Sequence, residues 1–148
     1  MQRRWRRSRI RIGKPCSQSL AATSMHLIQK GRIPYHLAVA FENNKFLCWA
    51  TNSPGIHAEQ KLIQNLMNMN KRYNMKWSKI TVYVLRVKFD ADKNAYYSLS
   101  KPCIECTKAL RKVNVRNVCW SVGGNMFESC RPCDLRSHHL SRKYRSYQ

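Results

Sequence analysis

Two short segments carry side chains that could hold a metal ion at a reaction site. The first is His57-Ala58-Glu59, and the second is Pro102-Cys103-Ile104-Glu105-Cys106. One neutral imidazole and two thiolates supply three protein ligands for Zn²⁺ and leave the fourth tetrahedral position to water. Cys103 and Cys106 are three positions apart, so a helix would place both sulfurs on one face, within reach of one ion. The residue types and their spacing therefore predict a zinc site that is open to water.

Glu59 is expected to lie beside the metal rather than to bind it. It stands two positions beyond His57, in a chain with only 7 acidic residues. Bound zinc lowers the pKa of its water toward about 7, and a nearby carboxylate can carry the proton that the water loses. The position of Glu59 therefore predicts a proton carrier.

Both motif segments are expected to begin helices. Apolar residues at helical spacing predict one helix from about Ile56 to Met69 and another from about Pro102 to Lys112. The positive end of each helix dipole favours a thiolate near the first turn. Pro102 suits a first helical turn, because its missing N–H would have had no partner there.

The remaining elements must hold these two helix starts together. A further helix is expected from about Ser17, ending before Gly31. The predicted strands are Tyr35–Phe41 and Phe46–Thr51 as a hairpin, Ile80–Phe89 as a central strand, and Arg116–Val122 and Asn125–Ser129 joined by a turn at Gly123-Gly124. This order of helices and strands implies an α/β fold in which helices pack on a mixed sheet.

The pattern H-x-E followed downstream by P-C-x-x-C resembles the cytidine/deoxycytidylate deaminase superfamily of zinc-dependent nucleobase deaminases. The order of elements over about residues 17–122 is also similar to that superfamily. The resemblance implies a cytidine deaminase-like, three-layer α-β-α fold with a mixed sheet of about five strands. It also implies that zinc is the cofactor and that its ligands are His57, Cys103 and Cys106.

The same resemblance implies a reaction and further site residues. Metal-bound hydroxide would attack C4 of a cytosine, or C6 of an adenine, Glu59 would be the catalytic proton shuttle, and ammonia would leave. Asn52, at the end of the second predicted strand, would hold the sugar of the substrate. The expected antiparallel last strand is similar to the cytidine deaminase branch of the superfamily.

Aromatic side chains near the pocket could hold a flipped base. Tyr96 and Tyr97 are expected in the loop before the third helix, beside the mouth of the pocket, and are candidate substrate-binding residues. Trp49, Tyr83 and Trp120 fall inside predicted strands, where aromatic residues are more often part of the core.

The second Cys-x-x-Cys pair, Cys130-Arg131-Pro132-Cys133, leaves two further interpretations open. In one, the two pairs together build a closed four-cysteine structural zinc site, which leaves the His-x-Glu motif unexplained. In the other, Cys130 and Cys133 join His138 and His139 in a second, structural zinc site.

The charge of the chain predicts a polyanionic partner. The sequence has 28 Lys+Arg against 7 Asp+Glu, a net charge of +21. We divide it into a basic arm at residues 1–16 that is disordered alone, a deaminase-like zinc domain at 17–129, and a basic tail with Cys and His at 130–148. The candidate nucleic-acid-binding residues of the arm are Arg3, Arg4, Arg6, Arg7, Arg9 and Arg11. Such an arm also fits an import or transit signal.

Composition further limits the compartment and the class of protein. The sequence has no run of about 18 apolar residues and no apolar core of a secretory signal, which excludes a transmembrane helix and argues against secretion and a membrane partner. Its 7 cysteines, an odd number partly in metal-like pairs, are typical of a reducing intracellular compartment. Cytoplasm, nucleus and a virion or nucleoprotein all fit.

Two functions from different classes fit these observations. The favoured one is a zinc-dependent hydrolytic deaminase acting on cytosine in a nucleotide or, given the charge, in single-stranded DNA or RNA. The alternative is a catalytically silent, deaminase-like component that packages nucleic acid in a nucleoprotein or virion, with zinc as a structural pin. Glu59 favours the enzyme, because a purely structural site gains nothing from that carboxylate. The resemblance also makes a homo-oligomer an expectation, since small members often complete their pockets across subunit interfaces.

Overall fold

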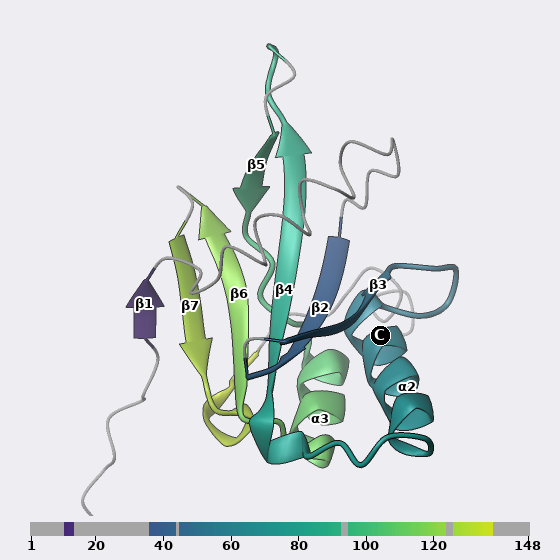
Figure 1. Cartoon of the computed structure of the whole chain (residues 1–148). Helices are drawn as coiled ribbons and strands as arrows, with labels where there is room; N and C mark the ends of the chain where they lie inside the picture. Colours follow the sequence, from purple (N-terminus) through teal and green to yellow (C-terminus); the bar gives the residue numbers. More distant parts are fainter. Residues whose placement is uncertain (1–10, 14–35, 44, 93–94, 124–125, 138–148) are drawn as a thin grey trace, which may run out of the picture.

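A computed structural model of the chain describes residues 11–13, 36–43, 45–92, 95–123 and 126–137. Within these residues, seven strands form one mixed sheet in the order β1-β7-β6-β4-β2-β3, with β5 paired to β4 beside that path (Figure 1). The strands are β1 (Arg11–Gly13), β2 (His36–Glu42), β3 (Lys45–Thr51), β4 (Ile80–Phe89), β5 (Ala95–Ser98), β6 (Asn117–Gly123) and β7 (Met126–Cys130).

β4 lies at the centre of the sheet. It pairs antiparallel with β2 and β5 and parallel with β6, and β6 pairs antiparallel with β7. Because β4 and β6 are parallel, the chain between them must return along the sheet, and α3 (Ile104–Val113) makes that crossing. The start of α3 therefore lies toward the ends where β4 and β6 finish.

α2 (Ala58–Asn70) and α3 lie side by side on one face of the sheet (Figure 1). On that face β2 presents Ala38 and Ala40, both fully buried, and these small side chains let α2 approach the sheet closely. Leu62, Leu66 and Leu110 fill the space between the helices and the sheet and have no exposed surface. Burial of each leucine contributes about 1.5–3 kcal/mol.

The other face of the sheet carries a second apolar cluster. Its buried members, which alternate along the strands with the helix-side residues, are Leu37, Val39, Phe41, Tyr83, Leu85, Cys119 and Phe127. Tyr83 packs edge-on against Phe41, with ring centroids 5.7 Å apart, and against Phe127 at 6.5 Å. Trp120 is fully buried on the helix side, and Trp49 packs against the second cluster. All three of the aromatic residues expected in the core thus pack against a core cluster.

Most of the expected elements are confirmed. Both hairpins, the central strand and the two motif helices lie within two residues of their predicted bounds, and the last pair of strands is antiparallel. The sheet is larger than the expected five strands, because β1 and β5 were not predicted. Residues 11–13, expected in a disordered arm, instead pair with β7. The helix expected near residues 17–30 lies outside the described residues, so the third layer stays a prediction.

Neither helix in the described part of the chain is long and apolar enough to span a membrane.

Candidate metal centre and active site

His57, Cys103 and Cys106 come together although they are far apart in the sequence. His57 immediately precedes α2, Cys103 immediately precedes α3, and Cys106 lies in the first turn of α3. The Nδ1 atom of His57 is 3.3 Å from the sulfur of Cys106 and 3.5 Å from that of Cys103. Both cysteines are buried. The starts of the two helices thus place one nitrogen and two sulfurs at one point.

This arrangement fits zinc. Zinc bonds of about 2.0–2.1 Å to nitrogen and 2.3 Å to sulfur, at a tetrahedral angle, put the nitrogen and sulfur ligands about 3.6 Å apart. The observed separations of 3.3 and 3.5 Å are close to that value. A set of one imidazole and two thiolates also favours zinc over the hard ions Mg²⁺ and Ca²⁺. In the described part of the chain, these three residues form the one group of three or more potential ligands.

The pKa values of the two thiols are shifted in opposite directions. A hydrogen bond from Cys106 to the sulfur of Cys103 outweighs burial and lowers the pKa of Cys103 to about 5. The same bond, burial and the nearby Glu59 carboxylate raise the pKa of Cys106 well above its usual value. A metal ion needs both sulfurs as thiolates, so its binding releases the proton that Cys106 holds.

A buried pair of serines anchors the segment that leads into Cys103. The Ser100 hydroxyl donates to the carbonyl oxygen of Val84 on β4 at 2.6 Å. It also accepts the Ser121 backbone N–H of β6 at 2.9 Å. Leaving such buried groups unpaired costs about 1–3 kcal/mol. The two central strands therefore set where α3 begins, and with it the position of both sulfurs.

Glu59 lies in the first turn of α2 and is 1% exposed. Its Oε1 atom is 2.8 Å from Nε2 of His36. Burial alone would raise the pKa of Glu59, but the hydrogen bond and charge of His36, with smaller contributions from Cys106 and His57, hold it below its usual value. These contacts therefore favour the ionised form of Glu59, which lies beside the three clustered ligands and could accept a proton.

Asn52 also lies at the start of α2. Its side-chain oxygen accepts the backbone N–H of Ala58 at 2.8 Å, which satisfies one of the free donors at the helix N-terminus. Its amide nitrogen is the end of the side chain that can meet a ligand. The proposed contact with a substrate sugar stays a prediction.

Tyr96 and Tyr97 lie in β5, so the prediction that they belong to a loop was wrong. Neighbouring strand residues point to opposite faces. Tyr97 packs edge-on against Phe127 on the face away from the helices, with centroids 5.7 Å apart. Tyr96 pairs in register with Lys88, lies on the helix side and is 45% exposed. The two tyrosines therefore lie on opposite faces of the sheet, and their role in substrate binding stays a prediction.

The alternative of a closed four-cysteine zinc site is wrong. Cys130 and Cys133 do not belong to the one ligand group among the described residues. Cys130 is buried in the helix-side core, and burial raises its pKa to about 11. Cys133 is exposed in the short helix η2 (Pro132–Asp134). His138 and His139 lie outside the described residues, so a second zinc site that includes them stays a prediction.

No pattern in the sequence marked His36 as a site residue. His36 begins β2 and is 23 positions before Glu59, and no local spacing rule links residues so far apart. Strand alternation is the pattern from which its position beneath α2 could have been predicted. His36 shares a strand face with Ala38 and Ala40, the small residues over which α2 packs.

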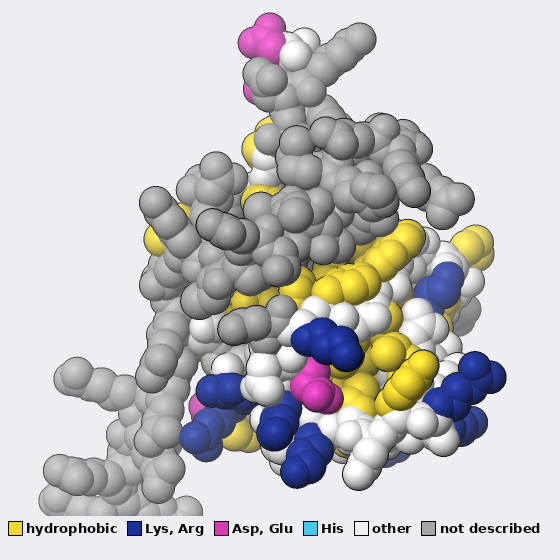
Figure 2. Space-filling view, in the orientation of Figure 1, with side chains coloured by type: hydrophobic (Ala, Val, Ile, Leu, Met, Phe, Trp, Pro, Cys, Tyr) yellow, Lys and Arg dark blue, Asp and Glu magenta, His cyan; other side chains and the backbone are white. Residues whose placement is uncertain are grey.

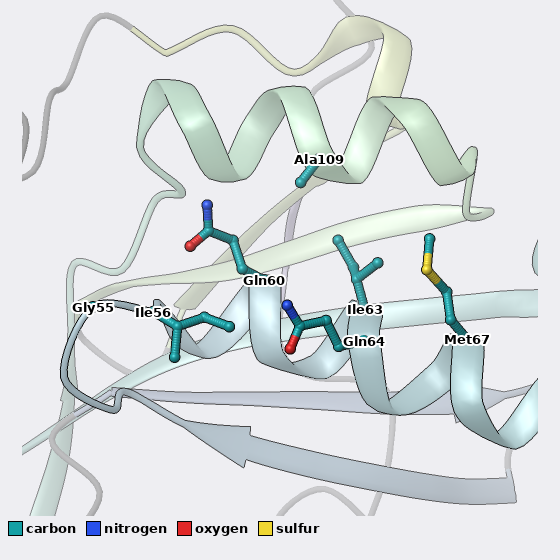
Figure 3. A pocket seen from close by; sticks show the side chains of 7 residues that line it. All are labelled: Gly55, Ile56, Gln60, Ile63, Gln64, Met67 and Ala109. Atoms are coloured by element: carbon teal, nitrogen blue, oxygen red, sulfur yellow. The ribbon is translucent and has the colours of Figure 1, made fainter.

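A shallow groove of about 410 Å³ runs between α2 and α3 (Figure 3). Most of its lining residues come from the side of α2 that faces α3. The lining residues are Gly55, Ile56, Gln60, Ile63, Gln64, Met67 and Ala109. The lining contains neither the three clustered ligands nor Glu59. The groove is therefore next to the site at which we expect chemistry rather than part of it, since the Gln60 side chain in its lining accepts the His57 backbone N–H at 3.2 Å.

Comparison with known proteins agrees with this site. A family model described as the cytidine and deoxycytidylate deaminase zinc-binding region matches residues 14–122, a range that contains Glu59 and all three clustered ligands. No curated protein and no solved structure matched the chain. The family match and the His/Cys/Cys cluster both point to zinc as the cofactor. Since the matched range covers well over half of the sequence, the chain belongs to the cytidine and deoxycytidylate deaminase zinc-binding family.

Proposed function

We propose that the protein is a zinc-dependent hydrolytic deaminase that acts on a nucleobase, with cytosine favoured, in single-stranded nucleic acid. The observation that carries this proposal is the Glu59 carboxylate, 1% exposed and next to the cluster of His57, Cys103 and Cys106. A buried charged group is costly unless it is paired, and a purely structural metal site has no use for one. The packaging alternative receives no support from the family match.

The residues divide the chemistry between binding and proton transfer. His57, Cys103 and Cys106 would hold zinc, which when bound makes a water molecule acidic near neutral pH. Glu59 would take the proton of the attacking water and deliver it to the ring nitrogen of the base. Water adds at the carbon that carries the amino group, and that carbon–nitrogen bond then breaks. Cytosine and water thus give uracil and ammonia.

A basic end of the molecule supports a polyanionic substrate. From Glu59 to its end at Asn70, α2 carries the chain about 17 Å, at 1.5 Å per residue. α3 ends at the same end as α2 (Figure 1). Figure 2 shows lysine and arginine side chains gathered over the lower part of the molecule. The exposed residues of this basic end are Lys71, Arg72, Lys76, Lys79, Lys112 and Arg116.

Further features of the basic end fit a nucleic-acid strand. Tyr73 is 67% exposed beside Arg72, and an aromatic ring among cations can stack on a base. Two acidic residues lie at this end: Glu42, opposite Ile80, and Asp134 in η2, next to the end of α3. Lysines and arginines neutralise phosphates, which favours a polynucleotide over a free nucleotide as the substrate.

Deamination of a mixed panel tests the proposal directly. The zinc-loaded, nuclease-treated chain is offered free cytidine, deoxycytidine, their monophosphates, single-stranded DNA, single-stranded RNA and transfer RNA. We expect ammonia release and a mass shift of the base with a single-stranded polynucleotide. Release from free nucleosides alone would contradict the substrate class, and silence across the panel would contradict the enzyme.

The salt dependence of binding should show which basic residues touch phosphate. For single strands, the slope of log K against log salt changes by about 0.7 for each phosphate contact. Deletion of residues 1–10 removes Arg3, Arg4, Arg6, Arg7 and Arg9 but keeps β1 paired with β7, and should reduce the slope by up to about 3.5. Fluorescence anisotropy with a labelled oligonucleotide measures it.

The basic end can be compared with the arm in the same assay. Changing Lys71, Lys76 and Lys112 together to glutamine should reduce the slope by about 2. The control is Lys108→Gln, whose ammonium already pairs with Glu105 at 3.3 Å and so should change the slope least. If neither the deletion nor the triple variant changes the slope, neither region contacts phosphate.

A further inference from the structure

The contact between His36 and Glu59 joins two parts of the fold at the site. His36 begins β2, and its Nε2 atom is 2.8 Å from Oε1 of Glu59 in the first turn of α2. The Glu59 side chain is 2% exposed and that of His36 is 24% exposed. A carboxylate accepts hydrogen bonds, so Nε2 of His36 carries the proton and donates it.

The sheet fixes where His36 lies. Its neighbours on the same strand face, Ala38 and Ala40, are fully buried beneath α2. The pairing of β2 with the central strand β4 begins at His36 itself, opposite Arg86. The imidazole therefore projects from a paired strand of the sheet, which moves less than a loop would.

The fixed histidine limits how the glutamate can turn. A glutamate has three rotatable side-chain bonds, and a carboxylate in a wide pocket would sample several orientations. The bond from Nε2 of His36 fixes Oε1, one of the two carboxylate oxygens, relative to the sheet. The Glu59 carboxylate is thus held from the side of the sheet, with Oε1 already engaged.

We propose that His36 is a positioning residue, which holds the Glu59 carboxylate in the orientation from which it transfers protons during deamination. This role rests on the proposed function. Correct placement of a reacting group accounts for much of the rate of an enzyme, and a misplacement of about 1 Å can lower the rate about 100-fold. The contact acts on the group that transfers protons, so the effect should fall mainly on kcat.

Two substitutions separate positioning from a general structural role. His36→Leu removes the donor and should lower kcat about 10- to 100-fold with little change in KM. His36→Gln keeps an N–H donor and should recover much of that loss. Zinc content and thermal midpoint are measured for both variants, so that misfolding is recognised. An unchanged kcat in folded, zinc-loaded His36→Leu would overturn the proposal, and so would a glutamine variant no better than leucine.

A spectroscopic measurement tests the contact without any turnover. The full chain labelled with ¹⁵N-histidine reports the Nε2 resonance of His36 by NMR. Glu59→Gln should shift that resonance, whereas Glu42→Gln, at the opposite end of β2, should not. A His36 signal insensitive to Glu59→Gln would overturn the positioning role even if the enzyme is active. Wild-type protein that is silent on every substrate would instead overturn the proposed function, and the catalytic role of His36 with it.

Discussion

Glu59→Gln is expected to lower turnover about 1,000-fold while the zinc content of the protein stays at the wild-type level. A positioned acid–base group contributes typically about 10²–10⁴-fold to a rate. Glutamine has nearly the shape of glutamate and can still accept the hydrogen bond of His36, but it cannot take a proton from water. Ammonia release on the substrate that responds, measured beside metal content, gives both quantities.

Glu42→Gln is the matched control for that variant. Glu42 is the last residue of β2, the strand that His36 begins, and it pairs in register with Lys45, far from the clustered ligands. The same change of charge there should leave turnover at saturating substrate at the wild-type rate. Glu59→Gln with wild-type turnover would remove Glu59 from the reaction, and loss of zinc would instead show that the carboxylate holds the metal site together.

The metal centre could be predicted from the sequence because its chemistry is local. Cys103 and Cys106 are one helical turn apart, and His57 stands two positions from the only acid in its segment. Each motif also marks the start of a helix, so the side chains and the elements that carry them are encoded together. What the motifs cannot encode is that α2 and α3 begin at the same point. The pairing of β4 with β6 and the buried bonds of Ser100 bring that about.

The errors concern elements that depend on a distant partner. β5 has only four residues, and it pairs with the end of β4, beyond the residues that pair with β6. Nothing in its own sequence required that pairing, so Tyr96 and Tyr97 were assigned to a loop. If this segment is taken as a strand, its alternation places the two adjacent tyrosines on opposite faces, so both cannot face the same pocket. β1, with three residues, has its partner in β7 more than a hundred positions away.

Cys106→Ser is expected to remove one zinc per chain and to lower the thermal midpoint by roughly 10 °C. A hydroxyl is a poor zinc ligand, and the serine would also be a polar group at a site with no exposed surface. A ligand present at about 1,000 times its Kd stabilises the folded state by about 4 kcal/mol. For a chain of about 150 residues, each kcal/mol corresponds to about 2–4 °C. Elemental analysis and melting followed by circular dichroism measure the two effects.

A chelator distinguishes loss of the metal from damage to the core. If zinc accounts for the lost stability, chelated wild-type protein should melt near the temperature of Cys106→Ser, and the variant should not respond to the chelator. Cys48→Ala is the matched control, because burial raises the pKa of Cys48 to about 11 and leaves it a neutral thiol outside the ligand cluster. That variant should keep its zinc and its sensitivity to the chelator. Full zinc content in Cys106→Ser would contradict the ligand assignment, since a buried thiol that binds nothing could be replaced without loss of metal.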